Sequence, residues 1–297
     1  MYKNKSAAIM VTYFPKKEFY TNLNIIANQV DMVVVYDNSD NINGKIDCNL
    51  LYDNCILFSY HQNHGIGKAL NDSLKYLNTI KKYDYIFTFD QDTLVDSSFT
   101  SNMIIEYTKV KINDVLIVTP TIYDVNQNVI GLHTNPNEEK KYKEIQLAIT
   151  SSSMLVQNIV ELDLLFNEDF FIDHVDHEFC IRARELGYKL ISLSKVKVDH
   201  ELGLSKIKRI FWKKFIYQEH SALRLYYFVR NGFTTIKNNN DKYFKNYFIK
   251  TLLKKVIKAT FLEDNKIQKI SFMTLGFYHF LINKKGSLND WYFISHI

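Results

Sequence analysis

Short strand-like runs alternate with helical patterns through the first two hundred residues, and this alternation limits the folds open to the chain. Runs of apolar, β-branched and aromatic residues occupy positions 7–13, 32–36, 56–60, 85–89, 115–119, 152–156 and 196–198. Between the early runs, residues 16–29 and 66–80 place apolar side chains at helical spacing. Strands separated by helices form βαβ units, in which helices cover both faces of a parallel sheet. We therefore predict an α/β fold with a mostly parallel sheet.

The character of the chain changes near residue 205. Residues 206–297 combine lysines with aromatic and aliphatic residues in a helical pattern, as residues 242–261 illustrate. The stretch 206–214 carries four lysines, one arginine and no acidic residue. We predict an α/β domain over residues 1–205, which would bind ligand and carry the chemistry, followed by a helical, basic and aromatic region over residues 206–297.

The composition of the 297-residue chain excludes several classes of protein. Apolar residues make up 46% and charged residues 23%, which matches globular usage and excludes a disordered chain. The net charge of +5 is modest for this length, so we expect no nucleic-acid partner. Three cysteines form neither a CxxC pair nor an even-numbered framework, which favours the reducing cytoplasm. The longest late apolar stretch, 270–282, is shorter than the roughly 20 residues that span a bilayer.

Polar clusters follow several of the predicted strands. They are residues 37–39, 61–65, 90–92 and 199–200. Ligands of open α/β sheets bind at the carboxyl ends of the strands, so these clusters are candidates for one binding site. Each cluster taken alone is equally consistent with ordinary turn chemistry. Their shared position at strand ends is what favours a site.

Asp90-Gln91-Asp92 is the sharpest of these clusters. Two carboxylates one residue apart at the end of a strand can approach one hard divalent cation. Mg²⁺ or Mn²⁺ accepts a few protein oxygens and completes its coordination with water and substrate phosphates. The alternative is a solvated loop with an Asx-turn. The central strand before the loop favours the metal.

A second candidate lies in residues 170–187, where a helix is predicted to end at Gly187. Asp176 falls in its first turn. It is either a carboxylate that stabilises the positive end of the helix or a general base at the sheet edge. Spacing alone leaves both roles open.

Five motifs in order carry a family resemblance: VTYFP (11–15), VYDNSDN (35–41), NHGIGKALN (63–71), FDQD (89–92) and FFIDHVDHEFCIRARELGY (170–188). Together they resemble the family 2 inverting glycosyltransferases of the GT-A fold. Two later motifs, His200-Glu201-Leu202-Gly203 and residues 220–231, make the chain most similar to bacterial rhamnosyltransferases of polysaccharide assembly. The resemblance covers roughly residues 7–232. It implies the GT-A fold, a Rossmann-like α/β fold whose mixed, mostly parallel sheet is flanked by helices.

The resemblance also implies roles for matching residues. Asp37 would bind the pyrimidine base of a nucleotide-sugar donor, and Asp90 and Asp92 would hold the metal and diphosphate, with His200 joining the metal. Asp176 would be the catalytic base, because it precedes Arg182 by the expected six residues. The implied donor-binding residues are Thr12, Tyr13, Asp37, Asn63, Gly65, Lys68, Asp90, Arg224 and Arg230.

The sequence departs from the family pattern at three positions. Val175 occupies the first acidic position of the Glu-Asp pair, Phe14 replaces a common Asn, and Ala222 replaces a common Pro. A retaining mechanism would need a second carboxylate, for which Asp173 is the nearest candidate, and we interpret it as a turn residue. The histidines at positions 61, 64, 174 and 177 are interpreted as hydrogen-bonded loop groups rather than metal ligands.

The implied activity is metal-dependent, inverting transfer of L-rhamnose from dTDP-L-rhamnose to a saccharide or lipid-linked saccharide, with Mg²⁺ or Mn²⁺ as cofactor. Such a reaction would serve bacterial surface polysaccharides such as O-antigen or capsule. The alternatives are another donor, UDP-hexose or UDP-galactofuranose, or an inactive nucleotide-sugar-binding module. A nucleotidyltransferase is disfavoured because residues 11–17 lack the glycines of a phosphate loop.

Two features of the C-terminal part remain open. Arg224 and Arg230 either bind a donor diphosphate or lipid phosphate, or are ordinary arginines of a partly buried helix. The basic and aromatic region either makes peripheral contact with the anionic cytoplasmic face of the membrane, or packs as a helical lid or homodimer interface.

Overall fold

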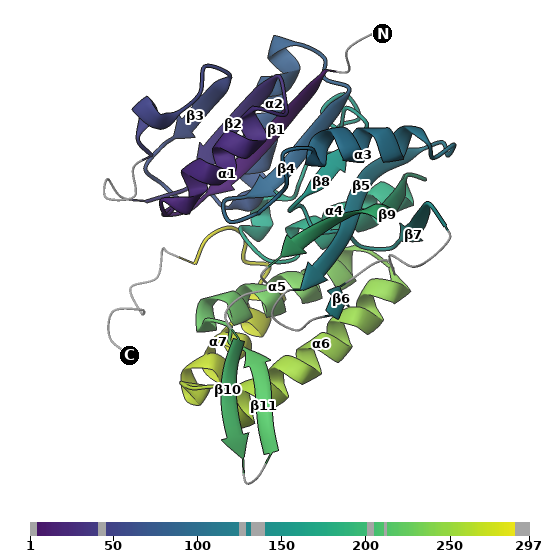
Figure 1. Cartoon of the computed structure of the whole chain (residues 1–297). Helices are drawn as coiled ribbons and strands as arrows, with labels where there is room; N and C mark the ends of the chain where they lie inside the picture. The colour runs from purple at the N-terminus through teal and green to yellow at the C-terminus, as the bar shows by residue number, and fades with distance from the viewer. Residues whose placement is uncertain are drawn as a thin grey trace. The chain divides into compact units, whose positions relative to one another are not determined.

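The structure is a computed structural model that describes residues 5–40, 46–124, 129–131, 140–200, 205–210 and 213–288 (Figure 1). The chain divides into two compact units. The first comprises residues 1–63, 69–165 and 179–202, and the second comprises residues 64–68, 166–178 and 203–297. The second unit thus combines the C-terminal region with two short segments that precede it. The functional boundary at residues 205 and 206 stays a prediction.

The first unit is built on a mixed sheet, as predicted. In the described residues its strands are β1 (Ser6–Thr12), β2 (Met32–Asp37), β3 (Cys55–Ser59), β4 (Tyr85–Asp90), β5 (Val115–Asp124), β6 (Val129–Gly131), β7 (Tyr142–Ile145), β8 (Ser153–Leu155) and β9 (Lys189–His200). Their order is β3-β2-β1-β4-β8-β5-β9-β7, and β6 pairs with β5 (Figure 1). Parallel pairs join β1 to β2 and β4, β2 to β3, and β5 to β9. Antiparallel pairing of β8 with β4 and β5 makes the sheet mixed.

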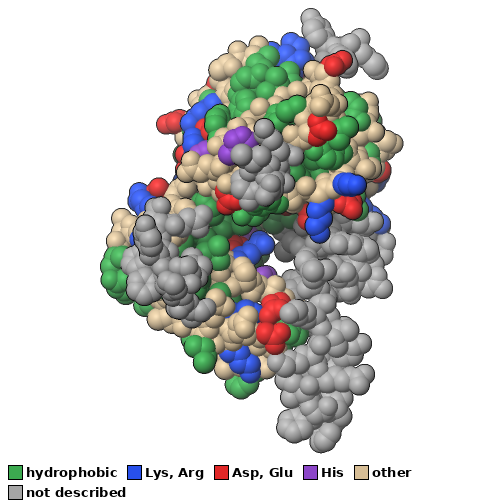
Figure 2. Space-filling model, turned by 90° about the vertical axis from the view of Figure 1, so that its left-hand side faces the viewer, with side chains coloured by type: hydrophobic (Ala, Val, Ile, Leu, Met, Phe, Trp, Pro, Cys, Tyr) green, Lys and Arg blue, Asp and Glu red, His purple; other side chains and the backbone are tan. Residues whose placement is uncertain are grey.

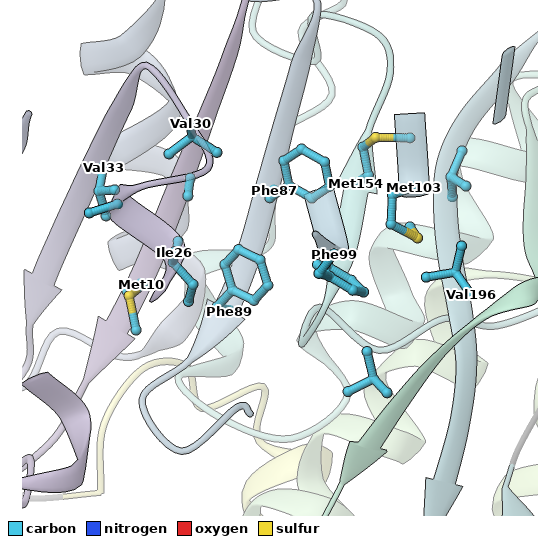
Figure 3. Close-up of a cluster of buried hydrophobic side chains, with 14 of the residues drawn as sticks. Met10, Ile26, Val30, Val33, Phe87, Phe89, Phe99, Met103, Met154 and Val196 are labelled. Atoms are coloured by element: carbon cyan, nitrogen blue, oxygen red, sulfur yellow. The ribbon is translucent and has the colours of Figure 1, made fainter. Parts of the chain in front are cut away.

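Helices α1 (Glu18–Ala27) and α3 (Phe99–Thr108) belong to this unit, and α2 (Ile66–Ile80) and α4 (Val175–Glu185) each cross the division between the units. Phe87 and Phe89 of β4, with Phe99 and Met103 of α3, form part of the buried core (Figure 3). The ring of Phe99 lies 6.3 Å from that of Phe87 and 5.9 Å from that of Phe89. Each buried side chain of this size contributes about 1.5–3 kcal/mol. This packing fixes the sheet that supports the strand ends.

The register of the central strands brings their carboxyl ends to one edge. Thr12 at the end of β1 pairs with Asp37 at the end of β2. On the other side of β1, Val11 pairs with Asp90 at the end of β4. The first and third predicted polar clusters therefore flank the end of the same strand.

The second unit contains three long helices: α5 (Ala222–Asn238), α6 (Lys242–Phe261) and α7 (Lys266–Leu281). The Ser221 side chain accepts a hydrogen bond from the Arg224 amide, and Asp241 accepts one from the Phe244 amide, so α5 and α6 both begin at an N-cap. Gly232 lets the Phe248 ring pack directly on the α5 backbone, where any side chain would collide with it. None of the helices in the described part of the chain is both long and apolar enough to cross a membrane.

The helical prediction for residues 206–297 was wrong at residues 206–210 and 213–218. Strands β10 (Ser205–Ile210) and β11 (Lys213–Gln218) pair there in antiparallel fashion. Ile207, Phe215, Ile216 and Tyr217 are β-branched or aromatic, and such residues favour strands. Lysines interleaved with them fit a two-residue period as well as a helical one.

Candidate functional site

The first unit holds Asp37 in a network of donors at the ends of β1 and β2. The carboxylate is 1% exposed. Its Oδ1 accepts hydrogen bonds from the Thr12 hydroxyl at 3.0 Å, the Ser39 hydroxyl at 2.6 Å and the Ser39 amide at 3.1 Å. Hydrogen bonds of this kind stabilise a buried carboxylate and fix its orientation. The predicted partners Thr12 and Asp37 are therefore in direct contact.

The residues after Thr12 are tied to the same edge. The Phe14 amide donates to the Ser39 hydroxyl at 2.7 Å, and Phe14 has a positive φ of 46°. Tyr13 is about half exposed, and its ring lies 4.7 Å from that of Phe14 in an edge-to-face arrangement. Partial burial, followed by the nearby Asp40, raises the pKa of the Tyr13 phenol. Tyr13 therefore offers an accessible aromatic face beside Asp37.

The Asp90-Gln91-Asp92 loop is anchored to β1. Gln91 Oε1 accepts a hydrogen bond from the Tyr13 amide at 2.8 Å, and the Gln91 carbonyl accepts one from Asn22 at 3.2 Å. The Thr93 hydroxyl accepts a hydrogen bond from the Asp90 amide at 3.1 Å. Asp90 is half-buried and Asp92 is exposed. The loop thus has a fixed backbone and one carboxylate directed to solvent.

Oxygen donors of this type suit a hard cation that completes its shell with phosphate oxygens and water. Among the side chains that the structure describes, no group of three or more His, Cys, Asp or Glu could by itself hold a metal ion. The side chain of His200, the third predicted ligand, lies outside the described part, although its backbone ends β9. The pair Asp90 and Asp92 fits a cation held jointly by protein and substrate.

In the second unit, Gly65 lies against the loop that precedes Asp176. Gly65 has a φ of +83°, and an added Cβ would lie 2.6 Å from the Phe171 carbonyl oxygen. The Phe171 carbonyl also accepts a hydrogen bond from the Ile66 amide at 2.8 Å. Only glycine adopts this φ readily and also leaves room for the Phe171 carbonyl. Local packing therefore explains the glycine at this position of the NHG motif. The predicted Lys68 belongs to the same segment and is half-buried, and Asn63, also half-buried, ends the preceding segment of the first unit.

The loop before α4 is conformationally strained and is clamped by α5. Phe171, Asp173 and His174 have φ values of 62°, 61° and 63°, which non-glycine residues adopt at a cost. The Asn231 amide group donates to the carbonyls of Phe170, Ile172 and Asp173 at 2.7 to 2.9 Å. One side chain thus binds three carbonyl groups of the loop.

Arg230 completes this clamp. It is 2% exposed, and its guanidinium donates to the carbonyls of Asp169, Phe170 and Gly286 at 2.7 to 3.2 Å. The guanidinium also lies over the Tyr227 ring, 4.9 Å from its centroid. Arg230 was a candidate to bind the nucleotide sugar, but in this structure its N–H groups donate to protein carbonyls. The alternative, an ordinary arginine of a partly buried helix, fits Arg230 better.

Asp176 lies in the first turn of α4, as predicted, and is half-buried. Its Oδ1 accepts a hydrogen bond from the His177 amide at 2.8 Å. Asp176 and Asp173 lie near Tyr247 of α6, and after burial these two carboxylates raise the pKa of its phenol to about 12. The neutral phenol therefore accompanies Asp176 at all physiological pH values.

Asp173 is held by a cation from α5. Arg224 Nε lies 3.3 Å from its Oδ2, and the Arg224 side chain is 57% exposed. Burial raises the pKa of Asp173 and outweighs the opposing effects of Arg224 and Lys255. Arg224, unlike Arg230, therefore presents much of its guanidinium to solvent. The assignment of Asp173 as a turn residue agrees with its positive φ.

Lys255 of α6 acts electrostatically on Asp173, and the sequence did not single it out. Burial lowers its pKa to about 8, with Arg224 and Lys258 adding to the effect and Asp173 opposing it. Its ammonium group lies over the Phe228 ring at 4.7 Å. Its helix carries five other lysines at similar spacing, so nothing in the sequence distinguishes it.

Two of the four histidines in question belong to this loop and helix. His174 Nδ1 and His177 Nδ1 are 3.0 Å apart, and burial, followed by His177 and Lys255, lowers the pKa of His174 well below its ordinary value. His174 also packs against the Phe228 and Phe244 rings. These contacts show that His174 is a buried, hydrogen-bonded histidine.

Comparison with known proteins bears on the resemblance that the motifs indicate. No family model matches the chain. The chain is 26% identical over 278 residues to the dTDP-rhamnosyl transferase RfbF of Shigella flexneri, with 90% of each chain covered. The chain is therefore similar, over most of its length, to a glycosyltransferase of the kind that the motifs indicate.

Solved structures agree with this fold. The chain superposes on S. aureus TarS 1-349 in complex with UDP-GlcNAc with a TM-score of 0.55 and 15% identity, over 92% of this chain and 80% of that one. It superposes on GalNAc-T7 with UDP, GalNAc and Mn²⁺ with a TM-score of 0.58 and 13% identity, over 94% of this chain and 56% of that one. At these identities the likeness establishes that the chain has the GT-A fold, and no more.

Proposed function

We propose that the protein transfers L-rhamnose from dTDP-L-rhamnose, with inversion, to a saccharide or lipid-linked saccharide of a bacterial surface polysaccharide. The observation that carries the proposal is the match to a dTDP-rhamnosyl transferase along 90% of both chains. The register of β1, β2 and β4 supports it, because it collects Thr12, Asp37 and Asp90 at one sheet edge. Ligands of α/β sheets bind at that edge.

The donor base would be bound by Asp37. Its carboxylate is oriented by Thr12 and Ser39, so it is ready to accept a hydrogen bond from the N–H of a pyrimidine. The half-exposed Tyr13 ring would pack against the base. Another part of the nucleotide would lie near Asn63, Gly65 and Lys68.

Asp90 and Asp92, with His200, would hold Mg²⁺ or Mn²⁺ together with the donor diphosphate. The bound cation would act as a Lewis acid that stabilises the charge on the departing diphosphate. Arg224 would contribute its exposed guanidinium to phosphate oxygens. Arg230 would not contact the donor, because its guanidinium donates to backbone carbonyls.

Asp176 would act as the general base. It would remove the proton from an acceptor hydroxyl while the hydroxyl oxygen bonds to the anomeric carbon. The bond from that carbon to the diphosphate oxygen breaks in the same step, and nucleoside diphosphate leaves with the electron pair. A positioned base of this kind contributes about 10²–10⁴-fold to the rate. Asp173 is a poor second nucleophile, since it is paired with Arg224 and burial raises its pKa.

The acceptor would be met at the cytoplasmic face of the membrane if it is lipid-linked, and a homodimer remains the alternative use of the C-terminal helices. A different donor, UDP-hexose or UDP-galactofuranose, is the second candidate, because solved structures of the same fold contain UDP-GlcNAc or UDP. A catalytically inactive nucleotide-sugar-binding module is the third.

A panel of nucleotide sugars tests the donor. The purified chain is incubated with dTDP-L-rhamnose, UDP-hexoses and UDP-galactofuranose in Mg²⁺, Mn²⁺ or a chelator, and slow release of nucleoside diphosphate is measured. We expect release from dTDP-L-rhamnose only with metal. Preference for a UDP-sugar would replace the donor, and metal-independent release would contradict the role of Asp90 and Asp92. Donor binding without release would indicate the inactive module.

A further inference from the structure

The outward side of α6 carries a row of large apolar side chains that the fold leaves exposed. Hydrophobic side chains reach the surface in several places (Figure 2). On α6 the row consists of Ile249, Leu253, Ile257 and Phe261, and the last three are 58%, 56% and 63% exposed. Residues four apart follow one another along one side of a helix, so the row extends over about 18 Å.

The opposite side of α6 already has its partners within the second unit. Phe244, Phe248 and Ala259 are buried. The ring of Phe248 packs on those of Phe228 and Phe233. The helix therefore needs no further contact for its own packing, and the exposed row is additional to the core.

The charge on α6 is of one sign. The helix contains six lysines and no acidic residue in twenty positions; they are Lys242, Lys245, Lys250, Lys254, Lys255 and Lys258. Lys250 and Lys254 are both exposed, and they directly follow Ile249 and Leu253 of the apolar row. Lysines beside exposed leucine, isoleucine and phenylalanine are the arrangement that inserts at the interface of an anionic bilayer.

This charge argues against a second copy of the chain as the partner. A two-fold dimer would place α6 of one copy on α6 of the other, because such an interface uses the same patch twice. Lysines would then face lysines with no acid on either helix, and like charges at an interface are destabilising. A surface of phosphate headgroups, by contrast, complements both the lysines and the apolar row.

We propose that the outward side of α6, centred on Leu253 and Ile257, docks on an anionic lipid surface. The apolar row would enter the boundary between headgroups and acyl chains, and the lysines beside it would contact lipid phosphates. The inference rests on the proposed function only in that a lipid-linked acceptor would be found at such a membrane. The surface itself is independent of the donor site.

Vesicle co-sedimentation of the full chain tests this. We use vesicles of phosphatidylcholine alone and vesicles that also contain about 30% phosphatidylglycerol. The wild type should bind the anionic vesicles, lose binding in high salt, and ignore the neutral ones. The double variant Leu253→Gln/Ile257→Gln should bind at least tenfold more weakly, and so should Lys250→Gln/Lys254→Gln.

Ile105→Gln is the matched control, because Ile105 is an exposed isoleucine of α3 in the first unit. It should bind as the wild type does. An unchanged melting temperature for every variant shows that the fold is intact. Release of nucleoside diphosphate from free donor should also be unchanged, so failure of docking and failure of the proposed activity are separable. Absence of wild-type binding, equal binding by Leu253→Gln/Ile257→Gln, or a dimer abolished by that variant would overturn the proposal.

Discussion

The two units place acidic groups in different ways. In the first, Asp37 ends a regular strand, and its carboxylate is fixed by the neighbouring strand end and by Ser39 two residues along. In the second, Asp176 follows a loop with three non-glycine residues at positive φ. That loop is held by Arg230 and Asn231, which come about sixty residues later in the chain. Regular strand ends position the proposed donor groups, whereas the proposed base needs a dedicated clamp.

The largest expected effect comes from the proposed base. Asp176→Asn should lower turnover by about 10²–10⁴-fold while the dissociation constant of the donor changes little, because the amide cannot accept the acceptor proton. Steady-state kinetics and calorimetric titration of the donor measure the two quantities. Glu185→Gln, at an exposed position of the same helix, is the control and should behave as wild type. Full turnover by Asp176→Asn would show that Asp176 is not the general base.

The metal-binding loop of the first unit should give a somewhat smaller effect. Asp92→Asn removes an exposed carboxylate without disturbing the core and should lower turnover by about 10²–10³-fold. It should also raise the Mn²⁺ concentration needed for half-maximal activity. Asp53→Asn, another exposed aspartate of the first unit, should change neither quantity. An unchanged metal requirement in Asp92→Asn would contradict its role as a ligand.

The clamp predicts a loss of both stability and rate. Asn231→Leu leaves three loop carbonyls without their common donor, so it should reduce the free energy of unfolding by about 2–3 kcal/mol. At temperatures where the variant is folded, kcat should fall more than KM rises, because the loop that Asn231 holds leads to the proposed base Asp176, whereas Asp37 and Asp90 of the proposed donor site belong to the first unit. Thr234→Ala on the same helix is the comparison. Chemical denaturation and kinetics check the prediction, and a loss of stability with normal kcat would mean that the clamp does not position Asp176.

Much of the first unit could be predicted because its signals are local. Alternation of β-branched runs with helical patterns located β1, β2, β3 and β4 to within about one or two residues. Polar clusters after buried strands indicated the edge where Asp37 and Asp90 lie. The strand β7 was missed, since its two middle residues are both charged and exposed, so that its four residues show no alternation of apolar and polar side chains. Short edge strands carry too few apolar residues to show a period.

The second unit was less predictable because its chemistry depends on distant partners. The arginines at positions 224 and 230 look alike in the sequence, yet one is paired with Asp173 at the surface and the other is buried among carbonyls. Asn231 has a role only because the strained loop presents carbonyls to it. Basic residues mixed with aromatic ones also fit both helix and strand, which is why the hairpin of β10 and β11 was not foreseen.

The smallest expected effect concerns pH. Burial, with Lys255 and Arg224 adding to it, lowers the pKa of His220 to about 3. Between its ordinary pKa near 6.5 and about 3, the unfolded chain binds a proton that the folded chain does not, so the free energy of unfolding should fall as pH falls. Asp173, whose pKa is raised, acts in the opposite direction. Between pH 7 and 4, the free energy of unfolding of His220→Gln should fall by about 1–2 kcal/mol less than that of the wild type. Denaturation at each pH measures it, and an equal fall in both proteins would contradict the lowered pKa of His220.

The stereochemistry of donor cleavage tests the central claim most directly, since it separates a single displacement assisted by Asp176 from a double displacement through Asp173. With dTDP-L-rhamnose, metal and water as acceptor, proton NMR recorded before mutarotation shows which anomer of rhamnose forms first. The account predicts the anomer opposite to that of the donor, with formation lost in Asp176→Asn. Retention of the donor configuration would contradict it, because retention requires a carboxylate nucleophile beside the anomeric carbon.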